Sequence, residues 1–259
     1  MLRIAYFSPL PPQRTGIADY SAELLPHLGE LAEVTLYASD PSSVPATLRD
    51  RFSVFDYASF SKQRWSHDVT LYHMGNSLFH RQIYHMLRRY PGVTVLHDYV
   101  LHHLLVESTL GEGDFAGYVR ELAYAHGEVG QVRAHAMRRG EQPLPLYRWP
   151  LSRRVTDLSL GVVVHSDTVR QRVLEASPRT QVAYINHPLP LPAPRDQRAL
   201  RARLDLPPDA FVVVTAGLMT GEKCPAVVAD AFRRLHERHP AAMWLIVGDT
   251  VEGDTPWEG

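Results

Sequence analysis

Three apolar segments of this chain each end abruptly at a histidine. The segments 68–72, 93–96 and 160–164 are followed by His73, His97 and His165. Short apolar runs of this kind are typical of strands that are buried on both faces of a parallel sheet. The carboxyl ends of such strands open onto the crevice where α/β sheets bind their ligands. The pattern therefore predicts titratable side chains along such a crevice.

Strands alternate with helical patterns along the chain, which predicts an α/β fold with a doubly wound parallel sheet. Four prolines between residues 186 and 194 form a semi-rigid, extended connector. We therefore predict a first Rossmann-like domain at residues 1–186, a linker at 187–195 and a second domain at 196–259.

The βα pattern restarts after this connector. A strand over 211–216 is followed by the loop 217–223, a helix over 225–239 and a strand over 243–249. Two strands and two helices in about 65 residues are too few to cover both faces of a parallel sheet. We therefore expect the second domain to be partial and the chain to be a fragment.

Composition excludes several classes of protein. A net charge of −1 gives no nucleic-acid footprint, and the single cysteine, Cys224, allows no intramolecular disulfide or cysteine-rich metal site. No apolar run reaches the ~20 residues of a membrane span, and no signal peptide precedes the first strand, so we predict a cytoplasmic protein. His126, Glu128 and His135 lack the spacing of a metal-binding HExxH helix, and we predict no metal.

A proline-rich loop follows the first strand and ends at Thr15-Gly16, before an amphipathic helix. Free N–H groups and the helix dipole favour anions at such a position, so this loop is a candidate phosphate site. The alternative is a simple turn glycine. A GxGxxG fingerprint is absent, which argues against a nicotinamide enzyme.

Further polar residues stand at strand ends or on the first helix. The candidate cleft-lining residues, besides His97, are Thr15, Tyr20, His73, Asn76, Asp98, His165 and Ser166. Each has a structural alternative: His97, Asp98 and Ser166 suit helix caps, and a Gly-Asn pair suits a turn. His102 and His103 are expected at the surface or lining the crevice.

The order and spacing of these segments resemble the retaining glycosyltransferases of family 4, which have the GT-B architecture. The resemblance runs along essentially the whole chain and is carried by the stretches FSP…GIADY, YHMGN, VLHD, VHS and AGLMTGEK. It implies a nucleotide-diphospho-sugar donor bound between two Rossmann-like domains, with no metal or other cofactor. The implied acceptor is a glycan, a lipid or a small molecule; peripheral membrane contact has no support in the sequence.

The resemblance also implies roles for single residues. Gly16 matches the glycine loop near the donor phosphates, His97 the histidine that faces the transferred sugar, and Lys223 the lysine that neutralises the leaving diphosphate. Gly217 opens the loop that carries Lys223. A lysine and helix N-terminal N–H groups can stabilise that charge in place of a metal. A histidine at a strand end can bind a sugar hydroxyl or carry a proton.

The chain departs from the family pattern at several points. Thr15 stands where the family often has a second glycine, and Leu218 stands where an arginine is common. The family's two glutamates, eight residues apart, are expected beyond residue 259, so the chain alone is expected to be inactive or nearly so. Two alternatives stay open: an epimerase or phosphorylase of the same architecture, and a non-catalytic sugar-nucleotide-binding or scaffold protein.

Overall fold

The computed structural model describes residues 1–141, 146–188, 193–217, 219 and 223–248. The chain divides into two compact units, Met1–Pro188 and Leu189–Gly259. Each unit is described by itself.

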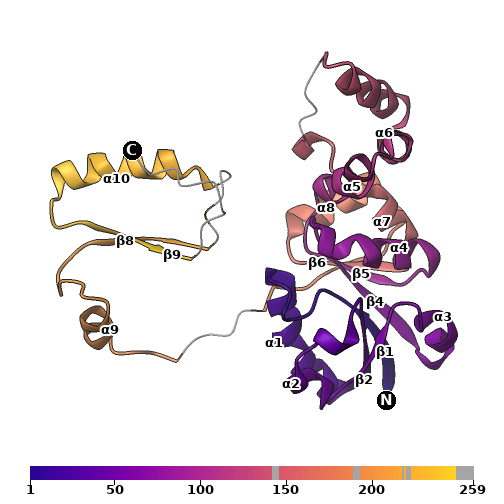
Figure 1. The fold of residues 1–259 in the computed structure, drawn as a ribbon, viewed down its shortest axis with the longest axis horizontal. Coiled ribbons are helices and arrows are strands. Elements are labelled where there is room, and N and C mark those ends of the chain that lie inside the picture. The colour runs from indigo at the N-terminus through magenta and orange to yellow at the C-terminus, as the bar shows by residue number, and fades with distance from the viewer. Residues whose placement is uncertain (142–145, 189–192, 218, 220–222, 249–259) are drawn as a thin grey trace. The chain divides into compact units, whose positions relative to one another are not determined.

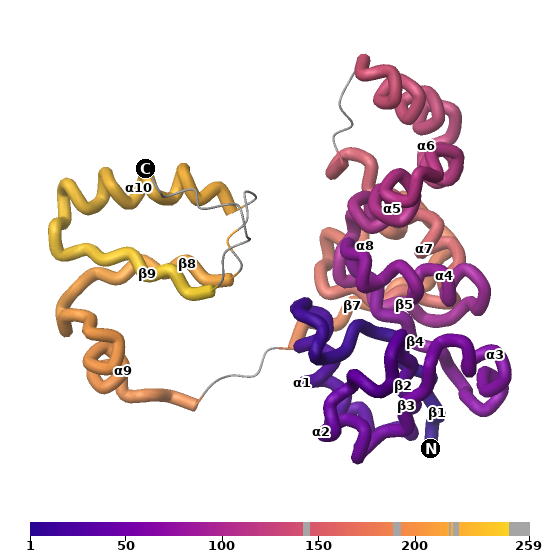
Figure 2. Tube along the Cα trace, viewed as in Figure 1, coloured from indigo at the N-terminus to yellow at the C-terminus, as the bar shows by residue number. Residues whose placement is uncertain are grey.

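The described residues of the first unit form a seven-stranded, all-parallel sheet in the order β3-β2-β1-β4-β5-β6-β7 (Figure 1). The strands are β1 (Leu2–Phe7), β2 (Ala32–Ala38), β3 (Ser53–Asp56), β4 (Val69–Met74), β5 (Val93–Leu96), β6 (Gly161–Val164) and β7 (Val182–Tyr184). The prediction of a doubly wound α/β fold is confirmed. The trace in Figure 2 runs from β1 outward to β3 and then returns beside β1 as β4.

Helices connect these strands. They are α1 (Gly16–Leu31), α2 (Ala46–Arg49), α3 (Phe60–Gln63), α4 (Arg81–Arg89), α5 (His102–Thr109), α6 (Phe115–Arg138), α7 (Arg153–Leu158) and α8 (Asp167–Ala176). Two apolar clusters lie on opposite faces of the sheet. On one face Leu25 of α1 packs with Tyr6 and Leu36, and on the other Tyr84 and Leu87 of α4 pack with Tyr72. Because α1 and α4 cover opposite faces, the switch between them falls at the β1–β4 boundary.

The connection from β5 to β6 is a helical excursion made of α5, α6 and α7. Gly127 interrupts α6 with φ 64° and ψ −149°, a backbone conformation that favours glycine. Helix α7 begins only at Arg153. Leu151 has φ 56°, which cannot continue a right-handed helix, and the carbonyl of Pro150 accepts from the Leu101 N–H at 2.7 Å.

The second unit contains α9 (Gln197–Arg203), β8 (Val212–Ala216), α10 (Pro225–Arg238) and β9 (Met243–Val247) among its described residues. β8 and β9 pair in parallel, with Val212 opposite Met243 and Ala216 opposite Val247. This is one βαβ repeat, as the sequence pattern predicts. Within the described part of both units, no helix combines the length and apolarity that a membrane crossing requires.

Candidate functional site

The strand register explains why three of the strand-end histidines share one face of the sheet. His73 pairs with Val95 in β5, and Val95 pairs with Val163 in β6. His97 and His165 follow these two valines by two residues each, and side chains two apart in a strand point to the same face. That is the face covered by α1, as the contacts of Tyr20 show. All three histidines therefore gather under this helix.

Tyr20 of α1 lies at the centre of the group. Its ring centroid is 4.8 Å from that of His97, 5.0 Å from His187, 5.5 Å from His165 and 5.6 Å from His73. The tyrosine is 8% exposed, and burial raises the pKa of its hydroxyl. We call these four histidines, with Tyr20, the histidine cluster. It lies at the carboxyl edge of β4 to β7, where this fold class binds its ligands.

One direct hydrogen bond joins two members of the cluster. Nδ1 of His73 lies 2.9 Å from Nε2 of His97. His73 is fully buried, whereas His97 is only partly buried. Burial is the main cause that lowers the pKa of His73 well below its usual value and that of His97 to about 3, and the neighbouring histidines add to both shifts. Both rings are therefore neutral near pH 7.

His80 and His165 each turn a ring nitrogen towards a carbonyl oxygen. Nδ1 of His165 is 2.9 Å from the Ile185 oxygen, and Nδ1 of His80 is 3.4 Å from the Ser77 oxygen and 3.2 Å from the Ser77 hydroxyl. Burial lowers the pKa of His165 and brings that of His80 to about 4. In both residues Nε2 is buried and has no hydrogen-bond partner among the described residues.

The Gly16 loop lies beside the end of β4. A Cβ placed on Gly75 would come within 2.4 Å of the Ile17 side chain, so the first turn of α1 contacts the β4–α4 loop. Gly16 opens α1 after Thr15, whose hydroxyl accepts a hydrogen bond from the Ile17 N–H at 3.4 Å. Gly16 does not adopt a positive φ, and a Cβ there would meet nothing within 4 Å. A turn that demands glycine therefore does not explain this residue, and the space in front of its backbone is open.

Asn76 and Asp98 lie at the same edge but are engaged in structure. The Asp98 carboxylate accepts from the Asn76 N–H at 2.9 Å, and the Asn76 side-chain oxygen accepts from the Leu104 N–H at 3.1 Å. The expectation that Asp98 caps the next helix is therefore wrong, because Asn76 supplies that cap from another loop. Ser166 occupies the N-cap position of α8, yet its side chain makes no capping hydrogen bond.

In the second unit, Gly217 and Lys223 lie together at the carboxyl end of β8. Nζ of Lys223 is 3.4 Å from the Ala216 carbonyl oxygen, and a Cβ on Gly217, which has φ 103°, would lie 3.2 Å from Nζ. Lys223 is exposed and precedes α10 by two residues. Leu218 lies outside the described residues. The placement of Lys223 opposite His97 stays a prediction, since each unit is described by itself.

One histidine of this edge, His187, was not predicted as a site residue. His187 follows β7 by three residues and reaches both Tyr20 and His165, with ring centroids 5.0 and 5.1 Å apart. The pattern of a histidine that follows a strand could have indicated it, although here Ile185 and Asn186 separate the histidine from the strand end. The expectation of a surface or crevice position for His102 is wrong: it is fully buried between the Trp149 carbonyl and the Tyr118 hydroxyl.

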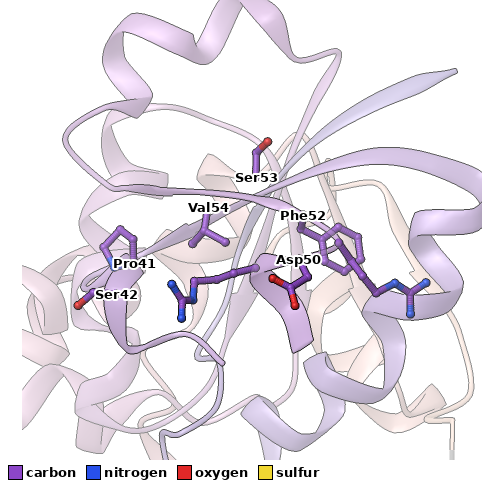
Figure 3. A pocket seen from close by; sticks show the side chains of 8 residues that line it. Pro41, Ser42, Asp50, Phe52, Ser53 and Val54 are labelled. Atoms are coloured by element: carbon purple, nitrogen blue, oxygen red, sulfur yellow. The ribbon is translucent and has the colours of Figure 1, made fainter. Parts of the chain in front are cut away.

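Two further features of the described chain were considered as sites: metal-binding groups of side chains and a surface hollow. No group of three or more His, Cys, Asp or Glu side chains in the described residues is arranged to hold a metal ion. A shallow hollow lies at β3, an edge strand of the sheet, and is lined by residues 41–42 and 49–54 (Figure 3). Its arginines are used to fasten the chain, because Arg49 donates to the Val44 carbonyl and Arg51 to that of Pro26.

Comparison with known proteins bears on the fold. No model of a protein family matches the chain, and no curated protein sequence matches it. Among solved structures, the chain is similar to the crystal structure of Anabaena Alr3699/HepE in complex with UDP, with a TM-score of 0.55 and 17% sequence identity. The match covers 99% of this chain and 63% of that one, so the chain spans less than two thirds of the length of that structure. At this identity the likeness supports a shared fold.

Proposed function

We propose that this chain is part of a glycosyltransferase of the GT-B class that binds a nucleotide-diphospho-sugar and transfers the sugar with retention to a glycan, lipid or small-molecule acceptor. The observation that carries the proposal is the histidine cluster beside the open N-terminus of α1, at the ligand-binding edge of a parallel sheet. The likeness to a structure that holds UDP points to the same class of ligand.

In this proposal the first unit supplies two interactions. The Gly16 N–H and the dipole of α1 face the donor phosphates, and the absence of a side chain at Gly16 lets an anion approach this helix start closely. His97 contacts the transferred sugar. Because the pKa of His97 is lowered to about 3, it acts there as a neutral hydrogen-bonding group and not as a cation.

Lys223 supplies the positive charge in the second unit. Nucleoside diphosphate departure concentrates negative charge on the leaving oxygen, and an ammonium group held at a strand end stabilises it as it forms. Lys223 forms no ion pair with a described residue, so its charge is available for a ligand. The lysine would thus do what a bound metal does in other transferases.

The sequence offers a sharp binding test, because Lys62 and Lys223 are its two lysines. Reductive methylation with ¹³C-formaldehyde keeps their charge and gives one NMR signal set for each lysine and one for the N-terminal amine. Titration with UDP, ADP and GDP is expected to shift the Lys223 signal with at least one of them and to leave Lys62, exposed on α3, unchanged. No shift of Lys223, together with no heat of binding in calorimetry, would refute nucleotide binding.

A non-catalytic sugar-nucleotide-binding protein is the second candidate. Leu218 favours it, because the resembled family commonly carries an arginine there and this chain has one cation fewer for the diphosphate. Both candidates predict binding, so product analysis separates them. Incubation of a nucleotide-binding, full-length protein with nucleotide sugars and a panel of acceptors would yield a free nucleoside diphosphate and a glycosylated product only if it is a transferase.

A further inference from the structure

His73 is a buried polar residue that the proposed chemistry does not use. It is fully buried and cannot touch a ligand, yet it forms the hydrogen bond to His97, the residue that the proposed function places against the sugar. Its second ring nitrogen, Nε2, is buried and has no partner in the described part of the chain. Burying a histidine ring nitrogen without a hydrogen-bond partner costs folding free energy. A functional role for the hydrogen bond from His73 to His97 would explain why this cost is tolerated.

Only two arrangements of the proton suit two neutral rings in this contact. In one, Nδ1–H of His73 donates to Nε2 of His97, and Nε2 of His73 is a bare acceptor. In the other, Nε2–H of His97 donates, and Nε2–H of His73 is a buried donor without a partner. A neutral imidazole carries one N–H, so each arrangement also sets the protonation of Nδ1 of His97. In the first arrangement this Nδ1 carries the proton, and in the second it is bare.

Three observations favour the first arrangement. Buried donors without a partner are rarer than buried acceptors without one. His165 in the same region faces the Ile185 carbonyl oxygen through Nδ1, so its Nδ1 carries the proton and its buried Nε2 is a bare acceptor. A bare Nε2 on His73 repeats this pattern. The Tyr6 ring beside His73 is inclined by 39°, which is not the perpendicular approach in which an N–H would point at its face.

We propose that His73 is a positioning residue for His97: its Nδ1–H donates to Nε2 of His97 and so holds His97 with an N–H at Nδ1. His97 is only partly buried, and its Nδ1 does not belong to the buried atoms that lack a partner in the described chain. Nδ1 of His97 is therefore the atom that can reach a ligand. His97 then offers a donor, which suits the oxygen of a sugar hydroxyl, and not a base that removes a proton. The ligand assignment rests on the proposed function; the tautomer does not.

The first experiment needs no ligand. Long-range ¹H–¹⁵N correlation spectra of the chain labelled with ¹⁵N-histidine distinguish a protonated from a bare ring nitrogen, and a His97→Gln spectrum identifies the signals of His97. We expect His97 in the Nδ1–H form and His73 in the Nδ1–H form. Finding His97 in the Nε2–H form would overturn the proposal.

The second experiment links the tautomer to binding. His73→Phe fills the site but removes the donor, whereas His73→Asn places an amide N–H where Nδ1 was. With UDP-glucose as the probe, His73→Phe is expected to weaken binding about tenfold, and His73→Asn to restore most of it, because one hydrogen bond to the sugar is at stake. UDP alone is expected to bind both variants as it binds the original chain.

The outcomes separate the two proposals. If neither UDP nor UDP-glucose binds while His97 shows the Nδ1–H form, the proposed function fails for this donor and the positioning role stands. If UDP-glucose binds but His97 keeps the Nδ1–H form in a folded His73→Phe variant, His73 does not set the tautomer. Equal loss of UDP and UDP-glucose affinity in His73→Phe would indicate a merely structural role and would also overturn the positioning proposal.

Discussion

The side-chain oxygen of Asn76, in the loop after β4, accepts a hydrogen bond from the backbone N–H of Leu104, in the first turn of α5, at 3.1 Å. Leu101, which directly precedes α5, has no side chain that can cap it, so the cap comes from a loop 28 residues earlier in the chain. The loop that carries Asn76 and the helix that follows β5 are thereby fastened to each other beside His97.

Replacing this cap is expected to cost stability. Asn76→Ala removes the acceptor and should lower the free energy of unfolding by about 1 kcal/mol. Urea unfolding followed by circular dichroism measures the change. Ser166→Ala is the matched control, because Ser166 also stands at a helix start but makes no capping bond, and it should change stability by less than about 0.5 kcal/mol. Equal effects of the two substitutions would contradict the assignment.

Gly16 and Gly75 are expected to respond to alanine in opposite ways. A Cβ on Gly16 meets nothing, so Gly16→Ala should fold with unchanged or slightly higher stability and yet obstruct an anion at the start of α1, lowering nucleotide affinity. A Cβ on Gly75 would lie 2.4 Å from the Ile17 side chain and 2.8 Å from the His80 ring, so Gly75→Ala should destabilise the fold by about 1–3 kcal/mol. Thermal unfolding and calorimetric nucleotide binding of both variants test this prediction. Unchanged nucleotide affinity in Gly16→Ala would show that Gly16 is not part of the binding site.

The buried histidines predict that acid destabilises the chain. The unfolded chain binds protons at histidine near pH 6.5, whereas the pKa of folded His80 is about 4 and that of His97 about 3. Below pH 6.5 the unfolded state therefore holds more protons, and stability falls as the pH falls towards these folded values. For the fully buried His80 this amounts to about 1.4 kcal/mol per pH unit, or about 2 kcal/mol at pH 5.

The variant His80→Gln tests this contribution. Urea unfolding at pH 7 and pH 5 should show a smaller loss of stability in His80→Gln than in the original chain. His27→Gln, on the exposed side of α1, serves as the control and should keep the original pH dependence. A loss of stability in His80→Gln as large as that of the original chain would show that His80 does not contribute to the acid sensitivity.

Glu121 of α6 links the helical excursion to α4 through Tyr84 and, within the excursion, links α6 to α7 through Arg154. Its carboxylate accepts from Arg154 at 2.7 Å and from the Tyr84 hydroxyl at 3.0 Å, and it is 7% exposed. Glu121→Gln should lower stability by about 2–4 kcal/mol, since it leaves Arg154 largely buried without its counter-charge. Glu141→Gln removes a pair with Arg139 that is exposed and should cost less than about 1 kcal/mol. Chemical denaturation of the two variants gives the comparison.

Local patterns predicted most of the sheet and the alternation of its helices. An apolar run such as 160–164 carries its own signal, because burial on both faces is visible in the sequence. That His73, His97 and His165 share a face depends on the register between strands, which no single segment specifies. The strand-end rule therefore predicted which residues meet but not that His73 is buried and His97 is the one left open.

The remaining errors concern interactions between distant segments. Asp98 stands where a local cap of α5 would be expected, but the Asn76 side chain accepts the hydrogen bond from this helix, and Asp98 bonds to the Asn76 N–H instead. His102 is buried because Tyr118 and the Trp149 carbonyl satisfy both of its ring nitrogens, and neither partner is adjacent in sequence. The start of α7 at Arg153 follows from the dihedrals of Leu151, which the local sequence does not predict.

The return of β4 to the side of β1 has a consequence for how this protein can diversify. Tyr20 of α1, the helix that follows β1, contacts His73 of β4, and the sheet extends outward from these two central strands in both directions. Segments near the β3 edge, such as residues 39–51, lie on the far side of β2 and contribute nothing to the histidine cluster. This segment can therefore change in sequence without altering the packing of the histidine cluster.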